Sequence, residues 1–236
     1  MNLASMMLLM VLTVGILGLF SVWSLSIYQA RTQAALSEVF TSMDQARKAQ
    51  LHFKTQIQEW KNILLRGHVA SDRASYLAAF EKEKAITSEL LDGLLPKLDH
   101  IQKSEALIKL LQVPDSQEFK GVSPQIRGEI EQAIAGLVVL NQTYEQALDE
   151  AQKDGLWDPR AADGFARGAD RNLIVVMDTV PVELERAYGD LVSLANLAAD
   201  ARFETLTSVV WVGVIFALSM VAFMLWRMLK HPALVK

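Results

Sequence analysis

Both ends of the chain are long stretches without a charged residue. No residue from Met1 to Gln29 is charged, and neither is any residue from Thr205 to Trp226. Each stretch exceeds the roughly 20 residues that a helix needs to cross a bilayer. The pattern predicts transmembrane helices over residues 1–28 and 205–227, with a polar domain over 29–204 between them and a short basic tail over 228–236.

The charges are distributed unevenly between the middle domain and the tail. All 27 acidic residues and 20 of the 23 basic ones lie between Arg31 and Glu204, and the last ten residues hold three basic residues and no acidic one. Short basic flanks stay in the cytoplasm, whereas long domains cross the membrane regardless of charge. We therefore expect both termini inside and the middle domain outside. The alternative for the first stretch, a cleaved signal peptide, lacks a basic start and an A-x-A site.

The composition excludes several classes of function. The chain has no cysteine, so it has no disulfide, no thiolate nucleophile and no cysteine-based zinc site. An acidic middle domain without a basic, aromatic-rich patch argues against nucleic acid as a partner. His52, His68 and His100 lack the spacing of metal ligands, and no phosphate loop or haem-attachment motif occurs. We expect no metal, no cofactor and no catalysis.

The start of the middle domain has the periodicity of a packed helix. Apolar residues recur at alternating spacings of three and four over four heptads, which predicts a helix in a left-handed bundle or coiled coil. Gln50 is a polar member of this seam, where it can fix the register between helices. The seam consists of Leu36, Val39, Met43, Ala46, Gln50, Phe53, Ile57, Trp60 and Leu64.

Turn and capping residues divide the rest of the domain into three more helices. No segment alternates with a period of two, so the domain is expected to be all-α. Neither junction with the apolar ends contains Pro or Gly. We therefore predict an up-down-up-down four-helix bundle that is continuous with two transmembrane helices. The predicted features are a stop at Gly67, a cap at Ser71 or Asp72, kinks at Pro96 and Pro181, a loop over Gln112–Val122, a stop near Asp154-Gly155, and starts at Ser123-Pro124 and Asp158-Pro159.

Helix direction places a group of cations at the membrane-distal end of this bundle, because the first helix ends there and the fourth begins there. Arginine forks suit carboxylate or phosphate, so the group is a candidate site for a small anionic ligand. The alternative is a solvated surface where the cations pair with Asp72, Asp163 and Asp170. The candidate ligand-binding residues are Trp60, Lys61, Asn62, Arg66, Arg73, Tyr76, Arg167 and Arg171, with Arg160 beside them.

Two motifs resemble a family of bacterial receptors. Residues 53–67, FKTQIQEWKNILLRG, resemble the pattern FKxQxQEWKNxLLRG in the first sensor helix of a large group of methyl-accepting chemotaxis proteins. Residues 167–171, RGADR, resemble the RGxDR element at the start of their fourth sensor helix. The resemblance implies a periplasmic four-helix sensor, anchored in the bacterial inner membrane, that forms dimers and transmits the state of a ligand across the membrane.

The sequence departs from this family after the second apolar stretch. Such receptors continue into a HAMP linker and a cytoplasmic signalling domain, whereas ten residues, 227–236, follow here. The leading hypothesis is a membrane-anchored chemoreceptor-type sensor, either truncated or acting through another protein. The alternative is a non-catalytic accessory subunit whose bundle docks onto a larger membrane complex. The partners expected are membrane lipid, a second copy, other chemoreceptors or that complex.

Overall fold

Helices account for every regular element in the part of the chain that the structure describes. The computed structural model describes residues 3–109, 124–153 and 155–230. No strand occurs within them, which confirms the all-α class. The predicted loop over Gln112–Val122 and the cap at Ser123 fall outside the described residues. The helices are α1 (Leu3–Arg66), α2 (Ala70–Asp92), α3 (Leu94–Lys109), α4 (Pro124–Gln152), α5 (Pro159–Ala166) and α6 (Arg171–Lys230).

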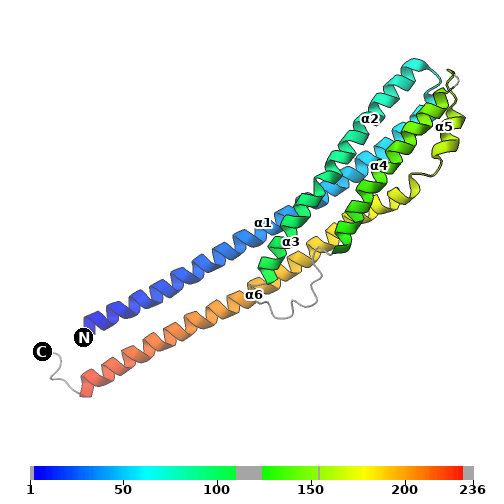
Figure 1. Ribbon diagram of the computed structural model, residues 1–236. Helices are drawn as coiled ribbons and strands as arrows, with labels where there is room; N and C mark the ends of the chain where they lie inside the picture. The colour runs from blue at the N-terminus through cyan, green and yellow to red at the C-terminus, as the bar shows by residue number, and fades with distance from the viewer. Residues whose placement is uncertain (1–2, 110–123, 154, 231–236) are drawn as a thin grey trace.

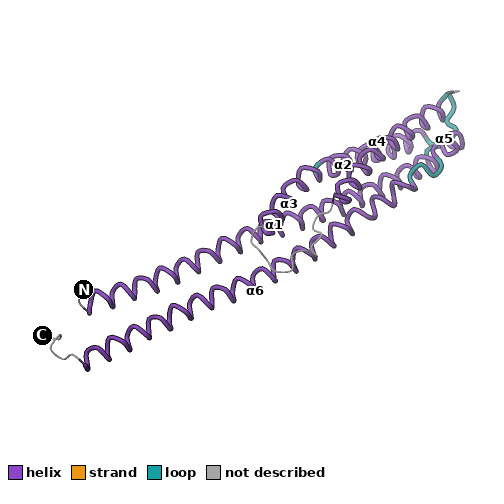
Figure 2. The backbone as a smooth tube through the Cα atoms, turned by 60° about the horizontal axis from the view of Figure 1, so that its bottom comes forward, coloured by secondary structure: helices purple, strands orange, loops and turns teal. Residues whose placement is uncertain are grey.

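Two long helices, α1 and α6, run side by side along the molecule. They have 64 and 60 residues, and the start of α1 and the end of α6 lie at the same end of the molecule (Figure 1). The four shorter helices lie along the second half of α1 and the first half of α6 (Figure 2). There α1 contacts α2, α3, α5 and α6, while α4 contacts α2, α3, α5 and α6. The shorter helices therefore surround one part of α1 and α6 and leave the other part uncovered.

The uncovered halves of α1 and α6 contain the uncharged stretches of the sequence. Among the described residues, these are the two helices whose length and composition suit a membrane span, with mean hydropathies of 1.4 and 2.3. In each helix, no residue of the most apolar segment is buried against the rest of the chain. A core helix of a soluble domain would bury such a surface. The exposed apolar surface is what a membrane-spanning segment presents to lipid.

The predicted seam of α1 forms one wall of the hydrophobic core. Val39, Phe53 and Ile57 are at most 5% exposed, and Leu36 and Leu64 pack against the same cluster while partly buried. Apolar faces of α2, α3, α4 and α6 complete the core. Because this apolar surface is removed from water, its burial is the main favourable contribution to folding. The structure confirms that this seam is the buried side of a helix.

Polar side chains link α1 to α4 and α6. Gln50, the polar member of the seam, donates from Nε2 to Asp178 Oδ1 of α6 at 2.7 Å. Gln56 donates from Nε2 to Asn141 Oδ1 of α4, also at 2.7 Å. Gln56 is fully buried, and its Oε1 has no partner among the described residues. Such hydrogen bonds fix how helices sit against one another, because slippage leaves buried polar groups unpaired.

A break at Gly93 separates α2 from α3. The sequence predicts a kink or interruption at Pro96, and the interruption lies three residues earlier, at Gly93. Pro96 therefore falls in the first turn of α3, where its missing N–H is tolerated. The Gln45 side chain of α1 reaches this break. Its Nε2 donates to the Leu90 carbonyl at 2.6 Å, and its Oε1 accepts from Lys97 Nζ. A Cβ on Gly93 would lie 2.6 Å from Gln45 Nε2, so a larger residue here would displace the Gln45 amide from its present position.

The predicted cap of α2 is wrong. The helix begins at Ala70 with Val69 as its N-cap, so neither Ser71 nor Asp72 caps it. The physical reason is the short turn after α1: the Arg73 N–H already bonds to the Val69 carbonyl at 3.0 Å. The first helical hydrogen bond therefore forms before the chain reaches the better capping side chains.

The start at Asp158-Pro159 is confirmed, but the helix that it opens is short. The Asp158 side chain accepts from two backbone N–H groups of α5, and Pro159 occupies the first turn. The predicted single fourth helix is two helices, α5 and α6, because Gly168 between them adopts a φ of +76°. The stop at Gly67 is confirmed, and Pro181 lies inside α6 without ending it.

Candidate functional site

Trp60, the candidate residue at the centre of the first motif, lies in the core. It is 5% exposed, and its ring stacks on Tyr144 of α4 with 4.4 Å between centroids and lies 6.1 Å from Phe80 of α2. Burial, and secondarily the negative charge of Asp170, raises the pKa of Tyr144 well above its usual range, so the phenol stays protonated. The structure places Trp60 behind the distal surface, where it holds three helices together.

Arg66 and Tyr76 meet at the distal surface. Arg66 is the last residue of α1, and its Nη1 lies 3.5 Å from Tyr76 Oη of α2, at the long end of the hydrogen-bond range. This hydrogen bond is the main cause that raises the pKa of Arg66. Arg66 is exposed and has no acidic partner among the described residues. Most of its five donors are available to an anion.

Arg73 joins three segments of the distal end. Its Nη1 donates to the Gly67 carbonyl at 2.7 Å, and its guanidinium carbon lies 4.8 Å from the centre of the Trp157 ring. The contacts tie the α1–α2 turn to the loop before α5 through a charged hydrogen bond and a cation–π interaction. Arg73 is therefore occupied by structural contacts, and its effect on a ligand would come through the positions of its neighbours.

The remaining candidates on α1 differ in their surroundings. Lys61 is exposed and has no partner among the described residues. Asn62 donates from Nδ2 to Glu59 Oε2, one turn earlier, at 3.2 Å. Asn62 is half-buried and already has this local partner. Of these two residues, Lys61 is the one whose charge is available to solvent.

Arg167 forms a solvated ion pair with Asp163, as the alternative to a ligand site predicts. Its Nε donates to Asp163 Oδ2 at 3.1 Å and its Nη2 to the same oxygen, with side-chain exposures of 73% and 42%. The hydrogen bond to Asp163 raises the pKa of Arg167. Such exposed pairs contribute little to stability. The neighbouring cations Arg160 and Arg171 are exposed and have no acidic partner in the described part of the chain.

The distal candidates therefore fall into groups rather than one closed pocket. Arg66, Tyr76 and Arg73 lie around the α1–α2 turn, and Arg167 and Arg171 flank the turn between α5 and α6. The Arg171 side chain lies over Gly168, where a Cβ would be 3.2 Å from Arg171 Nε. The arrangement offers exposed cations at the end of the molecule opposite the start of α1 and the end of α6 (Figure 1).

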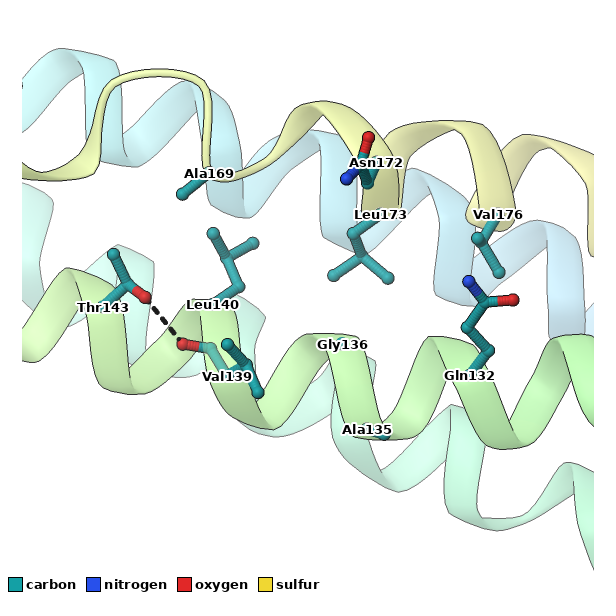
Figure 3. Close-up of a pocket in the computed structure, with 10 residues that line it drawn as sticks. All are labelled: Gln132, Ala135, Gly136, Val139, Leu140, Thr143, Ala169, Asn172, Leu173 and Val176. Atoms are coloured by element: carbon teal, nitrogen blue, oxygen red, sulfur yellow. Dashed lines mark hydrogen bonds between the residues drawn. The ribbon is translucent and has the colours of Figure 1, made fainter.

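A groove between α4 and α6 is a feature that the sequence did not lead us to expect. It has a volume of about 480 Å³, and no charged residue lines it (Figure 3). The two helices approach closely because α4 has glycine at position 136: a Cβ on Gly136 would lie 3.2 Å from Leu173 Cδ1. The groove is lined by Gln132, Ala135, Gly136, Val139, Leu140, Thr143, Ala169, Asn172, Leu173 and Val176.

Comparison with known proteins gives one informative similarity. No protein-family model and no solved structure matches the chain. The chain is 28% identical over 179 residues to the methyl-accepting chemotaxis protein CtpH of Pseudomonas aeruginosa. The match covers 76% of this chain and 27% of the relative, so the chain spans about a quarter of the relative's length.

This similarity supports a relationship to methyl-accepting chemotaxis proteins. Together with the two helices long and apolar enough to span a membrane, it suggests an inner-membrane protein.

Proposed function

We propose that the chain is the sensing part of a membrane-anchored chemoreceptor. In this proposal residues 29–204 form an up-down-up-down four-helix bundle in the periplasm, and residues 1–28 and 205–227 cross the inner membrane. Residues 228–236 lie in the cytoplasm, as does the N-terminus. The bundle binds a small anionic ligand at its membrane-distal end and transmits the bound state through the membrane.

The continuity of α1 and α6 is the observation that carries this proposal. Each helix runs without a break from the distal end, where the exposed cations lie, into an apolar half that no other helix covers. A rigid helix moves as a unit, so a contact that shifts its distal end also shifts its apolar end. A change of ligand state thus has a physical route along both helices, and the similarity to a chemotaxis receptor supports the same function.

The exposed cations support an anionic ligand. Three cations at the distal end are exposed to solvent and have no acidic partner among the described residues: Arg66, Lys61 and Arg171. Arginine can bind a carboxylate or phosphate through two parallel hydrogen bonds. In this proposal Arg66 is the principal ligand contact, because Tyr76 holds its guanidinium from one side. Trp60 and Arg73 hold the surrounding helices in place.

Thermal unfolding of the full-length chain in lipid nanodiscs tests the ligand. The chain is heated with a panel of carboxylates, phosphates and amino acids at constant ionic strength. A compound at 100 times its Kd should stabilise the protein by about 2.7 kcal/mol. Arg66→Ala should abolish the shift. Arg186→Ala is the matched control, because Arg186 is also exposed but pairs with Glu183 within α6 at 2.9 Å.

Two results would contradict the ligand proposal: no compound stabilises the chain, or Arg66→Ala and Arg186→Ala respond alike.

The other candidate function, an accessory subunit of a larger membrane complex, makes a different prediction. Purification of the full-length chain from native membranes would then recover one fixed partner complex. Recovery together with chemoreceptors supports the function proposed here.

A further inference from the structure

The groove between α4 and α6 has the size of a small-molecule site. Its volume of about 480 Å³ lies within the roughly 300–1,000 Å³ that such sites occupy. It extends along both helices, from Gln132 and Val176 at one end to Thr143 and Ala169 at the other (Figure 3). Ala169 and Ala135 have short side chains, which leave room between the helices.

We propose that this groove binds a small uncharged molecule that has an apolar chain and an amide or hydroxyl group. The site is separate from the distal cations and does not depend on the function proposed above. Arg167 and Arg171 flank the turn that contains Ala169, but neither of them lines the groove. The chemistry of the ligand follows from the apolar side chains, the amides and the charge of the lining.

Leucines and valines line the interior of the groove and account for the apolar chain. Leu140 of α4 and Leu173 of α6 point into the gap between the helices (Figure 3). They are at most 5% exposed and form its floor. Val176 is half-buried, and Val139 is 62% exposed. An apolar chain in the groove would remove the surface of these valines from water, which favours binding.

Two side-chain amides in the lining account for the polar group of the ligand. Gln132 of α4 and Asn172 of α6 have no hydrogen-bond partner among the described residues. Gln132 extends from α4 toward Val176 of α6 (Figure 3). A side-chain amide both donates and accepts, so an amide or a hydroxyl of a ligand matches it. The polar group of the ligand therefore belongs at the Gln132 end and the chain toward Ala169.

The charge of the lining selects against ions. None of the ten residues that line the groove is charged. A charged ligand would lose part of its hydration there without an ion of opposite sign to replace it. The distal cations have the opposite preference, because arginine favours carboxylate and phosphate. The charge of a ligand therefore distinguishes the groove from the distal site.

Three probes with the same chain length test this preference: hexanamide, hexanoate and hexylammonium. Ligand-observed NMR measures their binding to the full-length chain in lipid nanodiscs, and the signal from protein-free nanodiscs is subtracted because the probes also enter lipid. We expect saturable binding of hexanamide, and binding of the two ions in the groove that is at least about tenfold weaker. Arg66→Ala should leave hexanamide binding unchanged, whereas any hexanoate that binds the distal cations should be lost.

Substitutions that fill the groove test the location. Ala135 and Ala169 are exposed, so a larger side chain at either position does not disturb the core. Ala135→Leu should weaken hexanamide binding by about tenfold or more, and Ala169→Leu is a second, independent variant at the other end. Ala78→Leu is the matched control, because Ala78 is an exposed alanine of α2 outside the groove. Circular dichroism verifies that every variant is folded.

Gln132→Glu tests the polar end, because it keeps the size of the side chain and adds a negative charge. Hexylammonium should then bind more tightly than hexanamide. An unchanged order of the probes in this variant would overturn the proposal. So would equal effects of Ala135→Leu and Ala78→Leu, equal binding of all three probes to the wild type, or no saturable binding of hexanamide.

The outcomes also separate this site from the proposed function. Loss of the response to anions, with hexanamide binding intact, contradicts the proposed function alone. A response to anions that depends on Arg66, without hexanamide binding, contradicts the groove site alone.

Discussion

Replacing Asn141 by leucine tests the hydrogen bond that crosses the core from α1 to α4. The substitution removes the acceptor for Gln56 Nε2, and the Oε1 of Gln56 already has no partner among the described residues. The whole Gln56 amide, fully buried, would then be unpaired. A buried polar group left without its partner costs about 1–3 kcal/mol. We expect Asn141→Leu to destabilise the protein by about 2 kcal/mol.

The reverse substitution should cost less. Gln56→Leu removes the orphaned Oε1 together with the donor, and it leaves Asn141, which at 9% exposure lies at the margin of the core. The double variant Gln56→Leu/Asn141→Leu leaves no unpaired amide and should approach wild-type stability, because apolar replacement of both partners is nearly neutral. The two substitutions are therefore non-additive, with a coupling of at least about 1 kcal/mol.

Thermal unfolding of the full-length chain in nanodiscs, followed by circular dichroism, measures the cycle. For 150–250 residues, 1 kcal/mol corresponds to about 2–4 °C in Tm, so Asn141→Leu should lower Tm by about 4–8 °C. Gln142→Leu, an exposed substitution on the next residue, should stay within about 0.5 kcal/mol of wild type. Additive single substitutions would refute the reasoning, because they would mean that the amides do not depend on each other.

Three further predictions concern the helix ends and the α1–α6 contact. Gly168→Ala places a side chain at a φ of +76° and should lower stability by about 1 kcal/mol, measured as the Tm shift. Gly155 also has a positive φ, so Gly155→Ala cannot serve as the control for this substitution. Asp158→Ala removes the cap of α5 and should cost about 1 kcal/mol, with faster hydrogen exchange at the start of that helix; unchanged exchange would contradict the capping role. The hydrogen bond from Lys54 holds the pKa of Asp178 below its ordinary value of 3.8, so this contact stabilises the protein above that pH and is lost as the pH falls through the lower folded value. Lys54→Met should weaken the pH dependence of Tm in this acidic range, and an unaltered profile would contradict it.

The sequence predicts the core better than the connections. Val39, Phe53 and Ile57 are buried because their spacing puts them on one side of α1, and spacing is visible in the sequence. The break between α5 and α6 was missed, because the left-handed backbone of Gly168 depends on how the chain turns back onto α4. The predicted cap at Ser71 failed for a similar reason: the length of the turn after α1, and not the capping preference, decides where α2 begins.

In the candidate site, too, burial can be predicted from the sequence, whereas the contacts between distant segments cannot. The sequence places Trp60 both in the candidate ligand site and in the seam of α1, and the structure places it in the core. A seam position with an aromatic side chain is a signal for burial that could have removed it from the candidate set. The α4–α6 groove depends on which residues of two distant segments lie at one level, and that level is set by the contact of Gly136 with Leu173. A sequence pattern alone does not supply it.

The contact between Gln45 and Gly93 has a consequence for how sequences of this kind can diverge. A side chain at position 93 would displace the amide at position 45, and a shorter residue at 45 leaves the Leu90 carbonyl and Lys97 without their present partner. The two positions therefore constrain each other although 47 residues separate them in the chain. Among homologous sequences, a residue other than glycine at 93 should accompany a change at 45 more often than glycine does.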